Sequence, residues 1–141
     1  MQAPDSPVLL DTHVWVWLVG GGEKLSSQAT AAIRAAAKEG SVLVSAISVW
    51  EVAMLEKKGR LKFDRDCLEW VHAALSLPGL TLSPLSPEIA VASTRLPGDF
   101  GGDPADRILA ATARLVGARL VTRDRQILRY GKAESLSVIR A

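Results

Sequence analysis

The chain has 141 residues and a mass of 15.1 kDa, the size of one ordinary domain, and its 48% hydrophobic and 23% charged residues exclude a disordered or collagen-like protein. Lys and Arg number 17 and Asp and Glu 15, so the formal net charge of +2 does not by itself indicate nucleic-acid binding. The single cysteine, Cys67, excludes an internal disulfide and a cysteine-based metal site, and it fits a reducing compartment.

The sequence carries no signal for membrane insertion or export. Its longest apolar run, residues 14–19, is too short to span a bilayer. Residues 1–5 contain no basic residue ahead of an apolar stretch, which predicts that there is no signal peptide. We therefore expect a cytoplasmic protein that does not contact a membrane.

Short apolar segments alternate along the chain with longer segments of helical spacing. Strands are predicted at residues 8–10, 42–44, 80–82, 120–121 and 136–139. Helices are predicted at residues 26–38, 48–58, 66–77, 86–96, 103–116 and 124–130. This alternation predicts an α/β fold with a parallel sheet that is covered on both faces.

Acidic residues follow the strands of this predicted sheet. Asp11 ends the first strand, Glu51 follows the second, and Asp124 follows the fourth. Asp103 and Asp106 open the helix that leads into the fourth strand, so they lie at the same edge. Crowded carboxylates repel one another unless they are protonated or neutralised by a cation. Because all the donors are oxygens, the pattern indicates Mg²⁺ or Mn²⁺.

Helix capping offers a structural alternative for most of these acids. Ser48 and Glu51 fit a capping box, in which the glutamate only closes the start of a helix. Asp103 before Pro104 fits an N-cap followed by proline at the first helical position. Asp106 would then lie in the favourable positive end of the helix dipole.

Helix capping explains Asp124 more easily than it explains Asp11. Asp124 fits the cap of the short helix after it, with Thr122 as a rival cap. Asp11 is harder to explain, because it ends an apolar run, where a buried carboxylate costs free energy unless something compensates it. The functional interpretation therefore depends on all the acids occurring together.

Basic residues form two groups near these acids. Seven lie in a stretch where Asp124 is the only acid: Arg107, Arg114, Arg119, Arg123, Arg125, Arg129 and Lys132. A second group spans residues 57–65. Positive charge beside an acidic site suits a polyanion such as RNA, although solvated helix faces are the alternative, and the better one for Lys57 and Lys58. Most of the four tryptophans, Trp15, Trp17, Trp50 and Trp70, fit core packing or a subunit contact better than base stacking.

Four segments resemble the successive motifs of PIN-domain ribonucleases, most closely the VapC-type toxins of toxin–antitoxin systems. They are Leu9–His13, Ser45–Glu51, Asp103–Ala111 and Leu120–Asp124. The resemblance covers nearly the whole chain. It implies that residues 1–141 form a single PIN domain, a three-layer α/β/α sandwich around a parallel sheet of about five strands, and that Thr12–Val19 is a helix.

The resemblance also implies the site residues. Asp11, Glu51, Asp106 and Asp124 match the catalytic, metal-binding acids of the family, and Asp103 matches a further metal ligand.

Other residues near these motifs are expected to assist. Thr122 and Ser48 are expected to support the acids. Substrate contacts are expected from Arg107, Arg123, Arg125 and His13.

The function implied by the resemblance is that of a toxin that hydrolyses RNA with a Mg²⁺- or Mn²⁺-activated water. The implied partners are RNA, a VapB-like antitoxin and a second copy of the chain. A PIN-fold module that binds RNA or protein with little catalysis is the alternative. A haloacid-dehalogenase-type phosphatase needs a second acid where His13 stands, and a receiver-like module needs paired acids after the first strand, so neither fits.

Overall fold

A computed structural model describes residues 6–21, 23–98, 100–134 and 136–141. Its centre is a parallel five-stranded sheet in the order β3-β2-β1-β4-β5. The strands are β1 (Val8–Leu10), β2 (Val42–Ser45), β3 (Leu80–Ser83), β4 (Arg119–Thr122) and β5 (Val138–Arg140). The predicted parallel sheet is thus confirmed. The prediction that there is no signal peptide concerns residues 1–5, which lie outside the described ranges.

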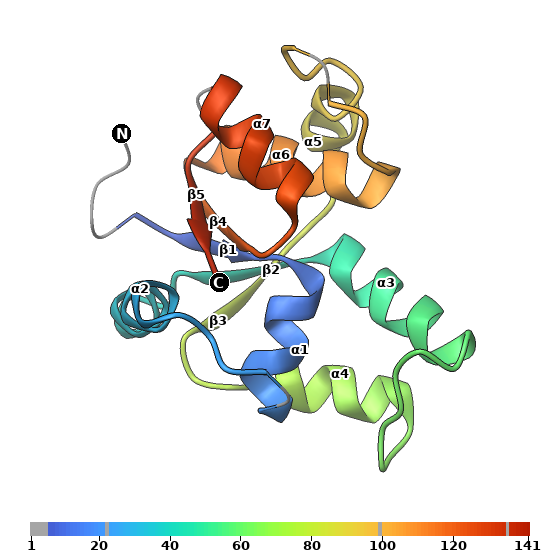
Figure 1. The fold of residues 1–141 in the computed structure, drawn as a ribbon. Helices are drawn as coiled ribbons and strands as arrows, with labels where there is room; N and C mark the ends of the chain where they lie inside the picture. The colour runs from blue at the N-terminus through green and yellow to red at the C-terminus, as the bar shows by residue number, and fades with distance from the viewer. Residues whose placement is uncertain (1–5, 22, 99, 135) are drawn as a thin grey trace.

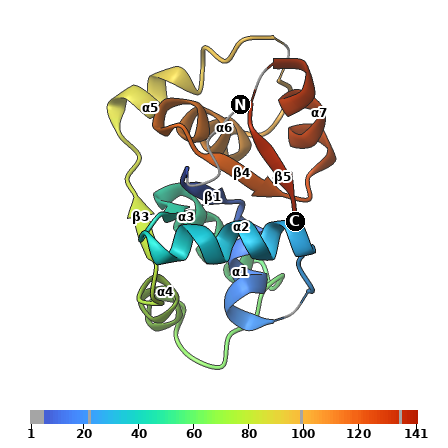
Figure 2. The same cartoon turned by 90° about the vertical axis from the view of Figure 1, so that its left-hand side faces the viewer.

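Helices cover both faces of the sheet. Within the described ranges they are α1 (Thr12–Gly20), α2 (Ser27–Lys38), α3 (Ala46–Lys57), α4 (Cys67–Leu75), α5 (Pro87–Ala92), α6 (Pro104–Val116) and α7 (Arg125–Glu134). Figures 1 and 2 show α5, α6 and α7 on one face and α1, α2 and α4 on the other, which confirms the three-layer sandwich. None of the helices described is both long and apolar enough to cross a bilayer.

The two apolar cores follow from the alternation of side chains along each strand. On β1, Val8 and Leu10 point into the core beneath α1, α2 and α4, whereas Leu9 points into the core beneath α6 and α7. On β4, Val121 points into the first of these cores and Leu120 into the second. Both faces of the central strands are therefore buried, and their polar side chains gather where the strands end.

The start of α3 differs from the prediction. The helix begins at Ala46, and the Ser45 side chain caps it by accepting a hydrogen bond from the Ile47 amide at 3.1 Å. Ser48 is fully buried inside the first turn, so the predicted capping box of Ser48 and Glu51 is wrong. The reason is that Ser45, at the end of β2, already offers a hydroxyl one turn earlier.

Helix α5 is shorter than predicted, because it ends at Ala92 rather than at residue 96. The Ser93 hydroxyl donates to the Ala90 carbonyl at 2.6 Å, and the Thr94 hydroxyl donates to the Val91 carbonyl at 2.8 Å. Such side chains compete with the backbone for helical hydrogen bonds, which accounts for the early end.

Helix α7 is longer than predicted, because it runs through Gly131 to Glu134. Gly131 serves close packing here rather than helix termination. A Cβ atom at this position would lie 2.9 Å from both terminal methyl groups of Val138 on β5 and 3.0 Å from the Leu136 carbonyl oxygen. Glycine therefore lets α7 approach the edge of the sheet.

We predict that Gly131→Ala lowers the free energy of unfolding by about 1–2 kcal/mol, because the overpacking exceeds the gain in helix propensity. Gly20→Ala is the matched control, since Gly20 also lies in a helix but has open space around it. It should leave stability unchanged or raise it by up to about 1 kcal/mol. Urea denaturation of both variants checks this, and a Gly131→Ala protein as stable as the parent contradicts it.

Candidate functional site

Asp11 lies between the end of β1 and the start of α1. Its Oδ1 accepts a hydrogen bond from the Thr12 amide at 2.7 Å and so caps α1. Its backbone amide donates to the Val121 carbonyl at 3.0 Å, which continues the pairing of β1 with β4. The carboxylate is therefore fixed by both the sheet and the helix.

Thr122 connects Asp11 to Asp124. The pairing of Leu10 with Val121 places Thr122 beside Asp11 on the neighbouring strand. The buried Thr122 hydroxyl donates to Asp11 Oδ2 at 2.6 Å and accepts from the Asp124 amide at 3.0 Å. Asp124 in turn caps α7, because its Oδ1 accepts from the amides of Gln126 at 2.8 Å and Ile127 at 3.1 Å.

Glu51 reaches the same edge from α3. Its Oε1 accepts a short hydrogen bond from the Thr12 hydroxyl. The Thr12 hydroxyl also lies 2.8 Å from the buried Ser48 hydroxyl, which is free to donate to it. Ser48 and Thr12 thus form a chain of hydrogen bonds that holds Glu51 next to Asp11.

Asp103 and Asp106 stand at the start of α6. Asp103 caps the helix, because its Oδ1 accepts from the Asp106 amide at 2.9 Å, and Pro104 occupies the first turn. The predicted cap is confirmed. Asp103 is exposed, whereas Asp106 is half-buried and faces the other acids.

Burial and mutual repulsion change the acidity of three of these groups. Burial raises the pKa of Asp106 to about 7, and the negative charges of Asp103, Asp11, Asp124 and Glu51 add to the effect. Burial also raises the pKa of Glu51, although the Thr12 hydrogen bond opposes the rise.

Asp11 follows the same rule. Burial raises the pKa of Asp11, and the hydrogen bonds from Thr122 and Thr12 partly offset the rise. The nearby charge of Asp124 acts in the raising direction. The structure thus brings the four other predicted acids within electrostatic range of Asp106.

The donor chemistry of this cluster fits a hard divalent cation. Carboxylate and hydroxyl oxygens are the ligands that Mg²⁺ and Mn²⁺ prefer, and a cation would remove the repulsion that raises these pKa values. Within the described part of the chain, however, no three acidic, histidine or cysteine side chains already stand in a closed arrangement around one ion. The cluster therefore fits the ion by charge and ligand type.

Two hollows of the surface include members of the cluster. One, of about 300 Å³, is lined by Asp11 and Asp124 together with His13, Trp17 and Arg123. The other, of about 290 Å³, is lined by residues of α3 and of the start of α6, among them Glu51 and Asp103. Both hollows are open to solvent, so the acids can meet a large substrate.

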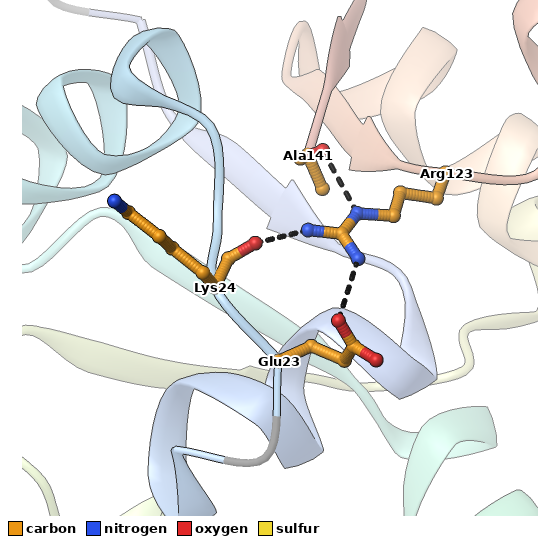
Figure 3. Close-up of polar contacts among 4 residues, drawn as sticks. All are labelled: Glu23, Lys24, Arg123 and Ala141. Atoms are coloured by element: carbon orange, nitrogen blue, oxygen red, sulfur yellow. Dashed lines mark hydrogen bonds and ion pairs between the residues drawn. The ribbon is translucent and has the colours of Figure 1, made fainter.

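Arg123 fixes the segments around the first hollow, as Figure 3 shows. Its Nε donates to the Ala141 carbonyl at 2.9 Å, and its guanidinium also contacts the Lys24 carbonyl and the Glu23 carboxylate, the latter at 3.4 Å. The guanidinium carbon lies 4.7 Å from the centroid of the Trp17 ring. Much of its hydrogen-bonding capacity therefore serves to connect the α1–α2 loop to the C-terminal end.

The other predicted substrate contacts lie around the site, and none of them forms such a bond with the residues that the structure describes. His13 is exposed and lines the first hollow, with its ring 6.0 Å from that of Trp17. Arg107 is exposed one residue after Asp106. Arg125 is also exposed, but it lines a separate hollow formed by α7 and β5.

Comparison with known proteins decides the family. The family model described as "PIN domain" matches residues 8–133. The chain belongs to the PIN-domain family. It is 38% identical over 120 residues to Ribonuclease VapC22 of Mycobacterium tuberculosis (strain ATCC 25618 / H37Rv), a match that covers 85% of this chain and 88% of that protein. The family resemblance drawn from the four motifs is thereby confirmed.

Two solved structures share the fold. One is a toxin–antitoxin complex from Klebsiella pneumoniae, with a TM-score of 0.62 and 22% identity over 94% of this chain and 96% of that one. The other is VapBC2 from Rickettsia felis bound to a promoter DNA fragment, with a TM-score of 0.66 and 17% identity over the same shares of the two chains. These likenesses concern the PIN fold itself.

The sequence interpretation missed Thr12 as a member of the site. The Thr12 side chain is buried, and its hydroxyl donates a hydrogen bond to Glu51. Its backbone amide donates to Asp11, so Thr12 fixes two acids of the site. The signal in the sequence was that Thr12, a residue with a hydroxyl group, directly follows the acid at the end of the first strand. Its role depends on the contact between α1 and α3, which no local sequence pattern shows.

The raised pKa values predict a pH-dependent stability for the metal-free protein. Because the folded state binds the proton of Asp106 more tightly than the unfolded chain does, the contribution of Asp106 to stability is full below about pH 4 and is lost as the pH rises through about 7. In EDTA, the Tm should be lower at pH 8 than at pH 5. Asp106→Asn should make this fall smaller, because its amide does not titrate, while Asp11 and Glu51 still contribute to it.

Thermal melts of the parent, Asp106→Asn and Asp64→Asn check this prediction. Asp64 is an exposed carboxylate whose only described ion pair is with its neighbour Arg65, so this control should keep the parental fall. An Asp106→Asn protein with the parental pH dependence would show that Asp106 is an ordinary surface acid.

Proposed function

We propose that this chain is a metal-dependent endoribonuclease that acts as the toxin of a toxin–antitoxin pair. The observation that carries the proposal is the cluster of five carboxylates at one sheet edge, with the pKa of Asp106 raised to about 7. Such a site favours a divalent cation and, through it, a phosphodiester substrate. The name of the VapC22 relative, a ribonuclease, supports RNA as that substrate.

The acids divide by position into two roles. Asp11, fixed by Thr12 and Thr122, and the half-buried Asp106 would hold the principal Mg²⁺ or Mn²⁺. Asp103 would add a ligand from the start of α6. In this position a cation supplies a water of lowered pKa and stabilises the charge that develops on the phosphate.

Glu51 and Asp124 would act on the attacking water. The pKa of Glu51 is raised by burial, so its carboxylate is a better proton acceptor than an exposed glutamate. The oxygen of the water would bond to phosphorus and the bond from phosphorus to one ribose oxygen would break. The proton of the water would pass to a carboxylate, and the leaving oxygen would take a proton from solvent. Ser48 keeps Glu51 in place through Thr12, and Thr122 does the same for Asp11.

Positive residues near the edge would hold the RNA backbone. Arg107 and His13 stand beside the acids, and Arg125 follows Asp124 at the start of α7. Arg123 would contribute partly through its charge and partly by fixing the walls of the first hollow. RNA as substrate implies that the protein acts in the cytoplasm.

A VapB-like antitoxin and a second copy of the chain complete the proposal. The two similar solved structures are toxin–antitoxin complexes, which supports an antitoxin partner. For the homodimer, the support is a hollow of about 620 Å³ between α5 and α6, whose lining includes two exposed apolar residues, Val91 at 46% and Leu115 at 54% exposure. Apolar surface of this kind is typical of subunit contacts.

The direct test is cleavage of cellular RNA by the purified protein. We predict that Mg²⁺ supports cleavage and that EDTA abolishes it. Asp11→Asn should reduce the rate to about one hundredth or less, because an amide binds the cation weakly, while its amide oxygen still accepts the capping hydrogen bond from the Thr12 amide.

The exposed Asp64→Asn is the control and should cleave like the parent, and circular dichroism should show that all three proteins are folded. A parent that binds RNA without cleaving it under any divalent cation would instead indicate a binding module. Asp11→Asn cleavage at the parental rate would refute the role given to this residue.

A further inference from the structure

The hollow on the α3 side of the acids has a composition that the acid chemistry does not explain. It extends from Glu51 and Asp103 at one end, past Trp50 and Met54, to basic residues at the other. Residues four apart lie on one face of a helix, so Trp50 and Met54 form a stripe along α3, which Lys58 at its C-cap continues. Lys58 follows Glu51 by seven residues, which is about 10 Å of helix.

Trp50 is unusual among the tryptophans of this protein because 57% of it is exposed. Trp15 is fully buried with its ring 5.1 Å from that of Trp70, and Trp70 stacks on Phe63 at 4.5 Å. Trp17 packs under the guanidinium of Arg123. Trp50 alone among these four presents a large aromatic surface to solvent next to an acid of the site, and this exposure has no benefit for folding.

The charge of the groove changes sign along its length. Lys58 and Arg60 line its far end, and within the described ranges no carboxylate forms an ion pair with either of them. Glu51 and Asp103 stand at the near end. A ligand that fits must therefore offer a flat apolar surface in the middle, negative charge at the basic end, and a metal-binding group near the acids.

We propose that this groove is a nucleotide-binding subsite of the RNA substrate, an inference that rests on the proposed ribonuclease function. A base next to the cleaved phosphodiester stacks on Trp50, and Met54 packs against its edge. The phosphate beyond that base lies between Lys58 and Arg60. Single-stranded nucleic acid is bound in this manner, by aromatic stacking combined with cations that follow the backbone.

The alternation of aromatic surface and cations favours RNA over a protein partner. A protein segment that covers Trp50 would need an apolar side chain, but it would leave Lys58 and Arg60 without counter-charges unless it were also acidic there. An RNA strand supplies a base and a phosphate in this order in every nucleotide. An RNA strand that follows the groove also brings its next phosphodiester to Glu51 without a bend in the strand.

The test uses a fluorescein-labelled single-stranded RNA of twelve nucleotides and mixed sequence, with Mg²⁺ present. Every protein carries Asp11→Asn so that the strand stays intact. Trp50→Ala should weaken binding about tenfold or more in fluorescence anisotropy, and Trp50→Phe should retain most of the affinity because it keeps an aromatic face. Leu68→Ala, at a similarly exposed apolar residue of α4, is the control and should bind normally.

Charge is tested separately by the salt dependence of binding. The double substitution Lys58→Gln and Arg60→Gln should make the slope of log Kd against log salt smaller by about 0.7, the value expected for the one phosphate that lies between them. Lys38→Gln, at the exposed end of α2, should leave the slope unchanged.

Two results would overturn the subsite. One is parental RNA affinity in Trp50→Ala, and if this variant also binds an antitoxin more weakly, the groove is a protein-binding surface. The other is a parental salt slope in the Lys58→Gln and Arg60→Gln double variant. If the parent chain cleaves no RNA but Trp50→Ala still loses RNA affinity, the proposed hydrolysis fails and the subsite stands.

Discussion

The repulsion among carboxylates held at one edge of the sheet is the constraint on which the site depends. Parallel strands end together, so the residues after β1 and β4 must meet, and α3 and α6 add their own acids to the same place. The two apolar cores supply the stability that holds these groups close despite their charge. The clearest sign of this crowding is Asp106, whose pKa is raised to about 7 by burial first and by the neighbouring negative charges in addition.

Helix capping and site chemistry are compatible uses of the same side chains. Asp103 and Asp124 each use Oδ1 to accept amide hydrogen bonds at the start of a helix. Their second oxygens remain available to a cation. Capping therefore fixes the direction of each carboxylate. The same acid can both cap a helix and take part in the site.

Much of the fold was predictable because it depends on local patterns. Buried parallel strands are continuous apolar runs, and glycine or proline marks most helix ends, so the elements and the sheet type followed from the sequence. The helix at Thr12–Gly20 did not follow in this way, since its β-branched and aromatic residues favour a strand by propensity. Only the family resemblance predicted it.

The parts that local patterns missed depend on contacts between distant segments. The sequence pattern predicts a helix end at Gly131, but the glycine is needed there because β5 packs closely against the helix. The proximity of the acids could be expected from the topology, whereas the hydrogen bond from Thr12 to Glu51 and the contacts of Arg123 required coordinates. Trp50 was expected to pack in a core or interface, and its exposure on α3 could not be read from its spacing.

The central claim is that the acids form a single cation site, and locating a bound ion tests it most directly. A crystal of the protein soaked in Mn²⁺ can be measured near the manganese absorption edge, where the anomalous signal identifies the ion. The account predicts an anomalous peak coordinated by Asp11 and Asp106. A saturating soak that gives no peak there, or a peak bound only elsewhere on the surface, would contradict it.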